Sequence, residues 1–265
     1  MTNDAPRLPD QTITLAGGSR IPLLGFGTWQ ITGDDAVRAT SAALGSGYRH
    51  LDTATVYGNE AEVGQALAES GVRRDEVFVT TKCLPENAGK ELDTLRRSLE
   101  LLQVDHVDLW LIHAPGSGSV NTDMWRAYVE ARDAGLATEI GVSNFDTAQI
   151  DEITGATGVT PAINQIRWSP LLFDAPTVGE HRDRGVALEG YSALRGGTLD
   201  HPAIVEVAER LGRTPAQVIV RWHLQHGVVV IPKSANAERI RSNADVGGFT
   251  LGDEDMATLD GLGGR

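Results

Sequence analysis

Two periods of apolar residues alternate along this chain of 265 residues. Short apolar runs rich in Val, Ile and Leu are followed repeatedly by longer stretches in which apolar residues recur every three or four positions. The first pattern is typical of strands buried on both faces, and the second is typical of amphipathic helices. The alternation therefore predicts an α/β fold built around a parallel sheet.

The chain begins with a different pattern. Within residues 12–22, Ile13 and Leu15 alternate with polar residues, and Ile21 resumes the apolar pattern. Gly17 and Gly18 lie between these two runs and can form a tight turn. The segment therefore predicts a β-hairpin ahead of the alternating part of the chain.

Eight segments after the hairpin read as strands, and helical patterns separate them. Eight such units in a chain of this length predict a (β/α)₈ TIM barrel. The expected strands are 23–27, 50–54, 77–82, 107–113, 139–143, 162–166, 186–191 and 228–231, and the clearest helical patterns cover 34–44, 59–69, 91–102 and 123–134, with Gly135 ending the last one.

An open, doubly wound sheet is the rival architecture. Its dinucleotide-binding fingerprint requires a third glycine after a strand and a tight turn. Here Gly25-Phe26-Gly27 is followed by Thr28, Trp29 and Gln30, so the fingerprint fails where it should appear. The sequence shows no low-complexity linker, and we expect residues 1–265 to form one barrel domain.

Charge and cysteine content narrow the functional classes. The net charge of −13 argues against binding to nucleic acid or to an anionic membrane surface. Cys83 is the only cysteine, which excludes a disulfide framework and a thiolate metal site, and we expect no metal. Residues 1–10 lack the apolar core of a signal peptide, and no apolar run is long enough to span a bilayer. We expect a cytoplasmic monomer.

Four ionisable residues lie at or near the ends of consecutive expected strands. Asp52 lies near the end of the second strand, Lys82 ends the third and His113 ends the fourth, while Tyr57 follows in the loop after the second. The carboxyl ends of parallel barrel strands share one face. We therefore expect the four side chains to meet.

Each of the four has an ordinary structural explanation when taken alone. Asp52 could cap a turn, Tyr57 could pack in a loop, and a lone histidine such as His113 is usually a satisfied core residue. Lys82 is harder to explain, because it ends an apolar strand where an unpaired charge is costly. Four separate structural explanations would require four coincidences at one rim of the barrel, so a single functional site explains the four residues better.

The residue types indicate proton transfer to a carbonyl oxygen. A phenol has a pKa of about 10, and a nearby ammonium such as that of Lys82 should lower it and make Tyr57 a usable general acid. Asp52 is the obvious partner for a buried Lys82, and His113 would polarise the oxygen as a neutral imidazole. No side chain supplies hydride, so a reduction implies a nicotinamide cofactor.

Several stretches resemble the aldo-keto reductases, including bacterial members of the diketogluconate-reductase type. The match covers nearly the whole chain in order. The stretches are Gly47-Tyr48-Arg49-His50-Leu51-Asp52-Thr53-Ala54, Tyr57-Gly58-Asn59-Glu60, Thr80-Thr81-Lys82, Asp108-Leu109-Trp110-Leu111-Ile112-His113, Ile140-Gly141-Val142-Ser143-Asn144-Phe145, Asn164-Gln165, Tyr191-Ser192 and Ile231-Pro232-Lys233-Ser234.

This resemblance implies an NADPH-dependent carbonyl reductase whose barrel bottom is closed by the hairpin. It makes Tyr57 the proton donor, Asp52 and Lys82 its tuning pair and His113 the orienting group, with Trp29, Tyr57 and His113 around the substrate. The implied NADPH contacts are Thr28, Ser143, Asn144 and Gln165 (the last three at the nicotinamide carboxamide), Tyr191 stacked on the nicotinamide, Ser192 and Leu194 along the pyrophosphate, Lys233, Ser234 and Arg239 at the 2′-phosphate, and Asn243 at the adenine. Two cations and a hydroxyl suit a phosphate dianion, which favours NADPH over NADH.

The sequence departs from the family pattern around the substrate. Ala114 follows His113 where the family often has tryptophan, and Leu84 stands where tryptophan is common. Ser242 replaces a frequent glutamate, Ala193 replaces a common proline, and the chain stops at Arg265 without a long C-terminal loop. We expect a wider pocket, and a small-molecule carbonyl whose identity fold-level analogy does not specify.

Two other functions fit part of the pattern. A lyase could use Lys82 as a Schiff-base nucleophile, although Asp52 beside it would keep the amine charged. A non-catalytic, cofactor-binding regulatory subunit is the other alternative, and the complete set of four residues argues against it.

Overall fold

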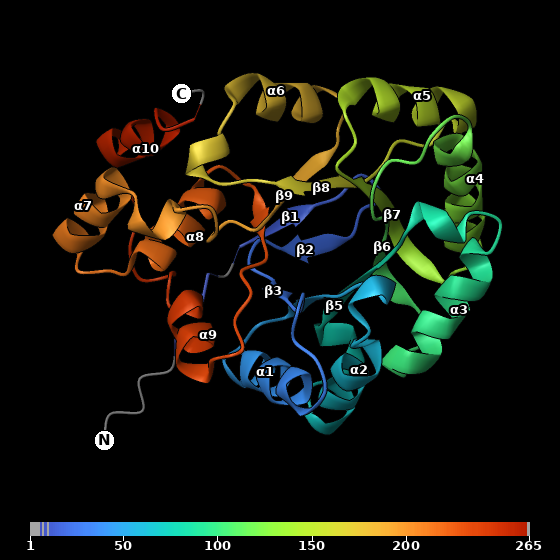
Figure 1. The fold of residues 1–265 in the computed structure, drawn as a ribbon, viewed down its shortest axis with the longest axis horizontal. Coiled ribbons are helices and arrows are strands. Elements are labelled where there is room, and N and C mark those ends of the chain that lie inside the picture. The colour runs from blue at the N-terminus through green and yellow to red at the C-terminus, as the bar shows by residue number, and fades with distance from the viewer. Residues whose placement is uncertain (1–5, 7, 10, 264–265) are drawn as a thin grey trace.

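The structure is a computed structural model that describes residue 6, residues 8–9 and residues 11–263. Eight parallel strands form one sheet and neighbour one another in the order in which they occur along the chain (Figure 1). They are β3 (Phe26–Gly27), β4 (His50–Asp52), β5 (Phe78–Cys83), β6 (Val107–Ile112), β7 (Ala137–Ser143), β8 (Ile163–Arg167), β9 (Ala187–Tyr191) and β10 (Val229–Val230).

The first and last strands of this sheet close it into a barrel. Leu24 forms a parallel bridge with Val230, and the Val230 amide donates to the Leu23 carbonyl oxygen at 2.8 Å. A Cβ atom on Gly27 would lie 2.8 Å from the Ile231 carbonyl oxygen, so the close approach at this seam requires glycine. The predicted (β/α)₈ barrel is confirmed, although its two seam strands are shorter than expected.

Helices surround the barrel, with α7 and α10 lying outside this ring (Figure 1). In α3, Leu95, Leu99 and Leu102 are buried. The helices are α1 (Asp34–Gly45), α2 (Glu60–Glu69), α3 (Glu91–Leu102), α4 (Val120–Asp133), α5 (Thr147–Thr157), α6 (Ala175–Asp183), α7 (Pro202–Leu211), α8 (Pro215–Gln225), α9 (Ala237–Ala244) and α10 (Asp253–Asp260), with short 3₁₀ turns η1 (Thr55–Tyr57), η2 (Arg74–Glu76), η3 (Pro85–Asn87), η4 (Pro170–Leu172) and η5 (Thr198–Asp200).

Helix α4 begins three residues earlier than its pattern predicted. The Asn121 side chain accepts a hydrogen bond of 2.7 Å from the Gly116 amide, which ties the added turn to the preceding loop. Its other end agrees with the prediction, since Gly135 follows the helix with a φ of 76°.

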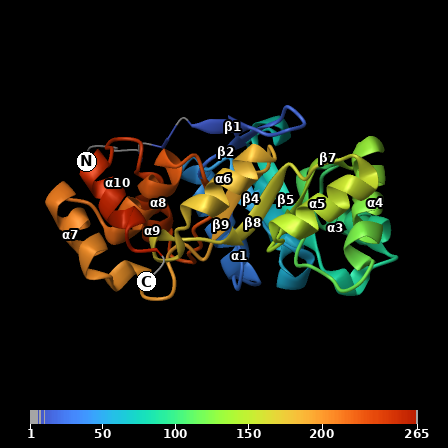
Figure 2. The ribbon, with the colours of Figure 1, turned by 90° about the horizontal axis from the view of Figure 1, so that it is seen from above.

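The N-terminal hairpin lies across one end of the barrel (Figure 2). Strands β1 (Thr12–Thr14) and β2 (Arg20–Pro22) pair antiparallel. The Ser19 amide donates to Glu139 Oε1 at 3.1 Å, and Glu139 belongs to the first half of β7. The hairpin therefore covers the amino-terminal end of the strands, opposite the rim that carries the candidate site.

Parts of two sequence predictions fall outside the described residues. These are most of the polar stretch 1–10 and the final residues 264–265. Within the part of the chain that the structure describes, no helix is both long and apolar enough to cross a membrane, and no group of three or more His, Cys, Asp or Glu side chains is placed to hold a metal ion.

Candidate functional site

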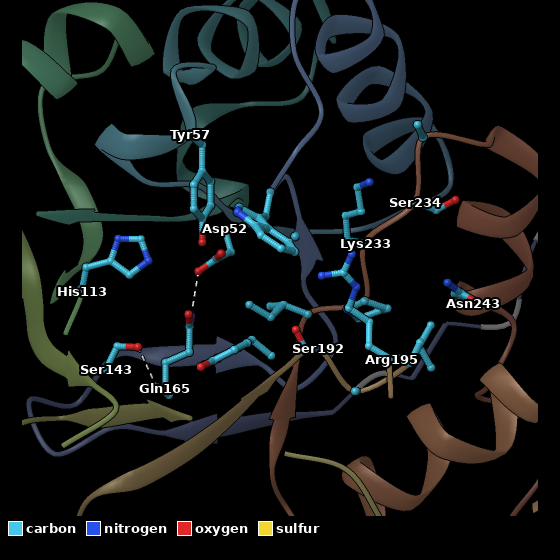
Figure 3. Close-up of a pocket in the computed structure, with 18 of the residues that line it drawn as sticks. Asp52, Tyr57, His113, Ser143, Gln165, Ser192, Arg195, Lys233, Ser234 and Asn243 are labelled. Atoms are coloured by element: carbon cyan, nitrogen blue, oxygen red, sulfur yellow. Dashed lines mark hydrogen bonds between the residues drawn. The ribbon is translucent and has the colours of Figure 1, made fainter. Parts of the chain in front are cut away.

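A cavity of about 720 Å³ opens at the carboxyl ends of the barrel strands. Its volume falls within the range of small-molecule and cofactor sites. Tyr57 and His113 line one end, and Lys233 lies at the other (Figure 3). Arg239 also lines the cavity. The predicted residues between and beside them that also line the cavity are Trp29, Asp52, Ser143, Asn144, Gln165, Tyr191, Ser192, Leu194, Ser234 and Asn243.

Asp52 and Lys82 form a buried ion pair beneath the cavity end lined by Tyr57 and His113, which we call the catalytic end because the sequence predicts proton transfer there. Lys82 Nζ donates to Asp52 Oδ1 at 2.6 Å and to the Thr53 carbonyl oxygen at 2.9 Å. The second carboxylate oxygen, Asp52 Oδ2, accepts from Gln165 Nε2 at 2.8 Å, and the pair is at most 2% exposed. A buried ion pair is tolerated when its remaining hydrogen-bonding atoms are satisfied in this way.

Tyr57 lies above this pair, at the end of η1. Its ring centroid is 5.1 Å from Lys82 Nζ. Burial raises the pKa of Tyr57 above its ordinary value, and the lowering effect of Lys82 is opposed by the raising effect of Asp52. The sequence-based prediction of a lowered pKa is therefore wrong in direction, because burial outweighs the ammonium. Tyr57 consequently holds its proton at neutral pH.

Lys82 keeps its positive charge inside the barrel. Burial lowers the pKa of Lys82, but Asp52 and Tyr57 raise it further than burial lowers it, so the pKa lies above its ordinary value. The ammonium is thus available to stabilise a phenolate at Tyr57 after proton transfer.

His113 follows β6 and faces Tyr57 across the end of the cavity. The two ring centroids are 5.6 Å apart, and the ring planes meet at 75°. Burial, followed by the charge of Lys82, lowers the pKa of His113 to about 3. The imidazole is therefore neutral, as the sequence predicted, and an oxygen atom between Tyr57 and His113 could receive a hydrogen bond from each.

The ends of β7, β8 and β9 form a connected polar wall next to the catalytic end. Ser143 Oγ donates to the Gln165 carbonyl oxygen at 2.7 Å, and Tyr191 Oη donates to Asn144 Oδ1 at 2.8 Å. Asn144 and Ser192 have φ angles of 61° and 56°, a left-handed conformation that non-glycine residues rarely adopt. Such conformations cluster at binding sites, where the surrounding structure holds them in place.

The opposite end of the cavity presents positive charge at the start of α9. Lys233 and Arg239 are exposed, whereas Ser234 and Asn243 are buried. Arg239 Nε donates to Ser234 Oγ at 3.3 Å, and the helix is capped by Asn236. Cations at the amino terminus of a helix can hold a phosphate.

Thr28 differs from the other predicted cofactor contacts. It is buried and does not line the cavity. Its amide and its hydroxyl both donate to the Asp52 carbonyl oxygen at 3.0 Å. The structure therefore places Thr28 as a support for Asp52.

The mouth of the catalytic end is open and largely apolar. Trp29 is 39% exposed and Val56 is 56% exposed, and Leu84 and Ala114 complete the lining on this side. Leu84 and Ala114 thus lie in the pocket wall, at the two positions where the family often has tryptophan.

The sequence-based predictions did not include two residues near the cavity, Arg195 and Glu189. The Arg195 guanidinium stacks on the Trp29 ring, 4.6 Å from its centroid. A cation directly after residues 191–194 in an acidic chain was the available signal. Glu189 lies two positions before Tyr191 in β9, so strand alternation places both on the inward face.

Comparisons with known proteins agree on one family. A model of the aldo/keto reductase family matches residues 23–263. An aldo-keto reductase of Mycolicibacterium vanbaalenii is 45% identical over 255 residues, covering 95% of this chain and 91% of that protein. An aldo-keto reductase of Mycobacterium tuberculosis is 42% identical over 267 residues, covering 99% of this chain and 94% of that protein.

Solved structures give the same result. An aldo/keto reductase of Brucella melitensis superposes with a TM-score of 0.92 at 40% identity, covering 95% of this chain and 99% of that one. A protein proposed to be a 2,5-diketo-D-gluconic acid reductase B superposes with a TM-score of 0.91 at 37% identity, covering 96% of this chain and 92% of that one.

Proposed function

Because this chain belongs to the aldo/keto reductase family, and is therefore an oxidoreductase of the kind that uses NAD(P)H, we propose that it reduces aldehydes and ketones with NADPH and with Tyr57 as proton donor. The observation that carries this proposal is the buried Lys82–Asp52 pair beneath Tyr57, with His113 facing the same end of the cavity.

The four residues divide the work of protonating a carbonyl oxygen. His113, as neutral imidazole, donates a hydrogen bond that orients and polarises the oxygen. Tyr57 transfers its hydroxyl proton to that oxygen as the alcohol forms, and Lys82 stabilises the phenolate left behind. Asp52 keeps Lys82 charged and fixed in position. A nicotinamide nucleotide, when bound, supplies the hydride that reaches the carbonyl carbon.

The cavity suits an extended dinucleotide carrying an extra phosphate. Ser143, Asn144 and Gln165 would hold the carboxamide beside the Tyr191 ring, and Ser192 and Leu194 would follow the pyrophosphate. Asn243 would contact the adenine, and Lys233, Ser234 and Arg239 would bind the 2′-phosphate. Among the described residues Lys233 and Arg239 form no ion pair, although the chain carries a net charge of −13. Two cations left without a carboxylate in so acidic a chain fit a phosphate ligand.

The geometry disfavours the lyase alternative. A Schiff-base nucleophile must be an uncharged amine that the substrate can reach. Lys82 is 0% exposed and donates to Asp52, which keeps it protonated. No contact in the described residues favours a purely regulatory role.

The decisive experiment is an NADPH consumption assay across aldehydes, diketones and keto-sugars. We expect oxidation of NADPH with at least the activated aldehydes, accompanied by formation of the alcohol. Failure of every compound, with NADPH binding intact, would support the regulatory alternative. A borohydride-trapped substrate adduct on Lys82 would instead support the lyase.

A further inference from the structure

The barrel interior beneath the Asp52–Lys82 pair contains two more titratable side chains, His50 of β4 and Glu189 of β9. Both side chains are 0% exposed, and His50 Nε2 lies 3.9 Å from Glu189 Oε1. Neither residue lines the cavity, so neither can touch a bound substrate or cofactor. A TIM-barrel interior is ordinarily filled by branched apolar side chains, which makes this pair unusual.

The polar atoms of the pair are poorly satisfied. Neither carboxyl oxygen of Glu189 makes a well-formed hydrogen bond with a described residue, and His50 Nδ1 is in the same position. His50 Nε2 lies 3.2 Å from Thr80 Oγ1. A buried carboxylate without hydrogen bonds is very costly, whereas the protonated acid is far less so. The surroundings therefore favour a neutral Glu189.

The space for this pair is provided by the backbone. A Cβ atom on Gly25 would overlap the imidazole ring of His50, so only glycine fits at the facing position of the barrel seam. In β9, Glu189 pairs in register with Gln165 on one side and Val229 on the other, and neither neighbour carries a charge.

The charges around Glu189 come from two strands and one turn. Asp52 and His50 face it from β4, Lys82 from β5 and Tyr57 from η1. Lys82 is the one cation in this described set, and Asp52 already neutralises it. An ionised Glu189 would therefore add an unbalanced negative charge below the pair.

The pKa values of both residues agree with this charge balance. Burial, and next the charge of Asp52, raises the pKa of Glu189 to about 8, although Lys82 and the nearby Gln165 amide offset part of this increase. Burial, and next the charge of Lys82, lowers the pKa of His50 to about 3. At neutral pH both side chains are thus uncharged, His50 as the neutral imidazole and Glu189 as the carboxylic acid.

We propose that Glu189 is a positioning residue for the proton transfer. As a neutral acid it adds no charge beside the Asp52–Lys82 pair and so preserves the effect of the ammonium on Tyr57, whereas its ionisation weakens Tyr57 as a donor. The inference rests on the proposed reductase function. When Glu189 releases its proton to hydroxide, a negative charge appears below Lys82. That charge raises the free energy of a phenolate at Tyr57, so Tyr57 gives up its proton less readily.

The test compares pH profiles of kcat/KM for carbonyl reduction in the wild-type enzyme and in Glu189→Gln. The wild type should lose up to about tenfold between pH 7 and pH 9 through one ionisation, whereas the permanently neutral amide should remove this alkaline limb. Glu139→Gln is the matched control, since Glu139 is also buried but contacts the hairpin, and it should keep the wild-type limb. An unchanged limb in Glu189→Gln would overturn the proposal.

A second measurement requires no substrate, and its main result comes from the wild-type protein. Infrared spectra of the wild-type protein should contain the carbonyl stretch of a buried carboxylic acid at pH 6.5, and the band should disappear as the pH is raised through about 8. Burial also raises the pKa of Glu60, so the test is the part of the band that is lost near pH 8, and where Glu189→Gln folds this part should be missing. A wild-type spectrum without the band would refute the neutral Glu189, whereas a protein that shows the band but reduces no carbonyl would refute the proposed function alone.

Discussion

The two ends of the cavity are built in opposite ways. At the catalytic end Asp52, Lys82 and Gln165 are almost completely buried, and hydrogen bonds of 2.6 and 2.8 Å connect them. At the proposed phosphate end, formed by Lys233, Ser234 and Arg239, both cations are exposed. Among the described residues their side chains share one hydrogen bond, of 3.3 Å between Arg239 and Ser234.

The difference fits the task that we propose for each end. Proton transfer requires groups fixed in advance within a poorly hydrated environment, because their reorganisation would raise the barrier. A bound phosphate would supply the negative charge that pairs with the cations. Before it binds, exposed cations stay hydrated and do not incur the penalty of burying an unpaired charge. Changes at the catalytic end should therefore alter rate and stability, and changes at the phosphate end should alter affinity alone.

Tyr57→Phe should have the largest effect. Loss of the proposed general acid should lower kcat for carbonyl reduction by about 10²- to 10⁴-fold. NADPH affinity, measured by fluorescence titration, should stay within about twofold, since the phenol is not among the proposed cofactor contacts.

Tyr48→Phe is the matched control for that variant. Tyr48 is buried, and its hydroxyl donates to the Ile240 carbonyl oxygen at 3.1 Å, away from the cavity. Its removal should cost about 1 kcal/mol of unfolding free energy and leave kcat unchanged. Strong residual turnover in Tyr57→Phe would remove Tyr57 from the role of donor.

Asp52→Asn should have the next largest effect, and it should act on stability as well as on rate. The amide would leave the Lys82 ammonium buried without a counter-charge, which costs about 3–5 kcal/mol. Urea unfolding would measure the loss. Asp93→Asn breaks an exposed ion pair with Arg96 and should lose less than about 1 kcal/mol. Equal losses in the two variants would contradict the contrast between buried and exposed charge.

Most of the fold and of the catalytic end could be read from the sequence. Buried parallel strands can be recognised in the sequence as apolar runs. Lys82 and His113 lie at the ends of two such runs, and the carboxyl ends of barrel strands lie together on one face. The seam strands could not be delimited, because their pairing depends on contact between Leu24 and Val230, distant in sequence. That residues 1–265 form a single domain remains a prediction.

Other features depend on depth and on loop geometry, which one sequence does not contain. The pKa of Tyr57 rises because burial exceeds the effect of Lys82, and burial cannot be measured from residue types. The contact between Arg195 and Trp29 joins loops far apart in the chain. Thr28 was assigned to the cofactor by resemblance, yet it is the Asp52 backbone that it contacts.

Arg239→Ala should sharpen the comparison from the other end. Loss of a charge-assisted contact to the 2′-phosphate should weaken NADPH binding by about 1.5–3 kcal/mol. NADH lacks this phosphate, so its affinity should hardly change, and kcat at saturating cofactor should be preserved. Arg241→Ala, two positions away on α9, is the matched control. Equal losses for NADPH and NADH would show that Arg239 does not recognise the phosphate.

Mild acid should produce the smallest effect and should again separate the two ends. A phosphate monoester has a second pKa of about 6, so acidification from pH 7.5 to 5.5 reduces the dianion about fourfold, and KM for NADPH should rise by up to that factor. The catalytic end should not titrate in this interval, because the pKa of His113 is lowered to about 3 while those of Tyr57 and Lys82 are raised. We therefore expect kcat to stay constant and KM for NADH to stay constant with it. A parallel fall of kcat with both cofactors would mean that a group at the catalytic end is protonated in this interval. The pH response of the two ends would then differ less than their exposure indicates.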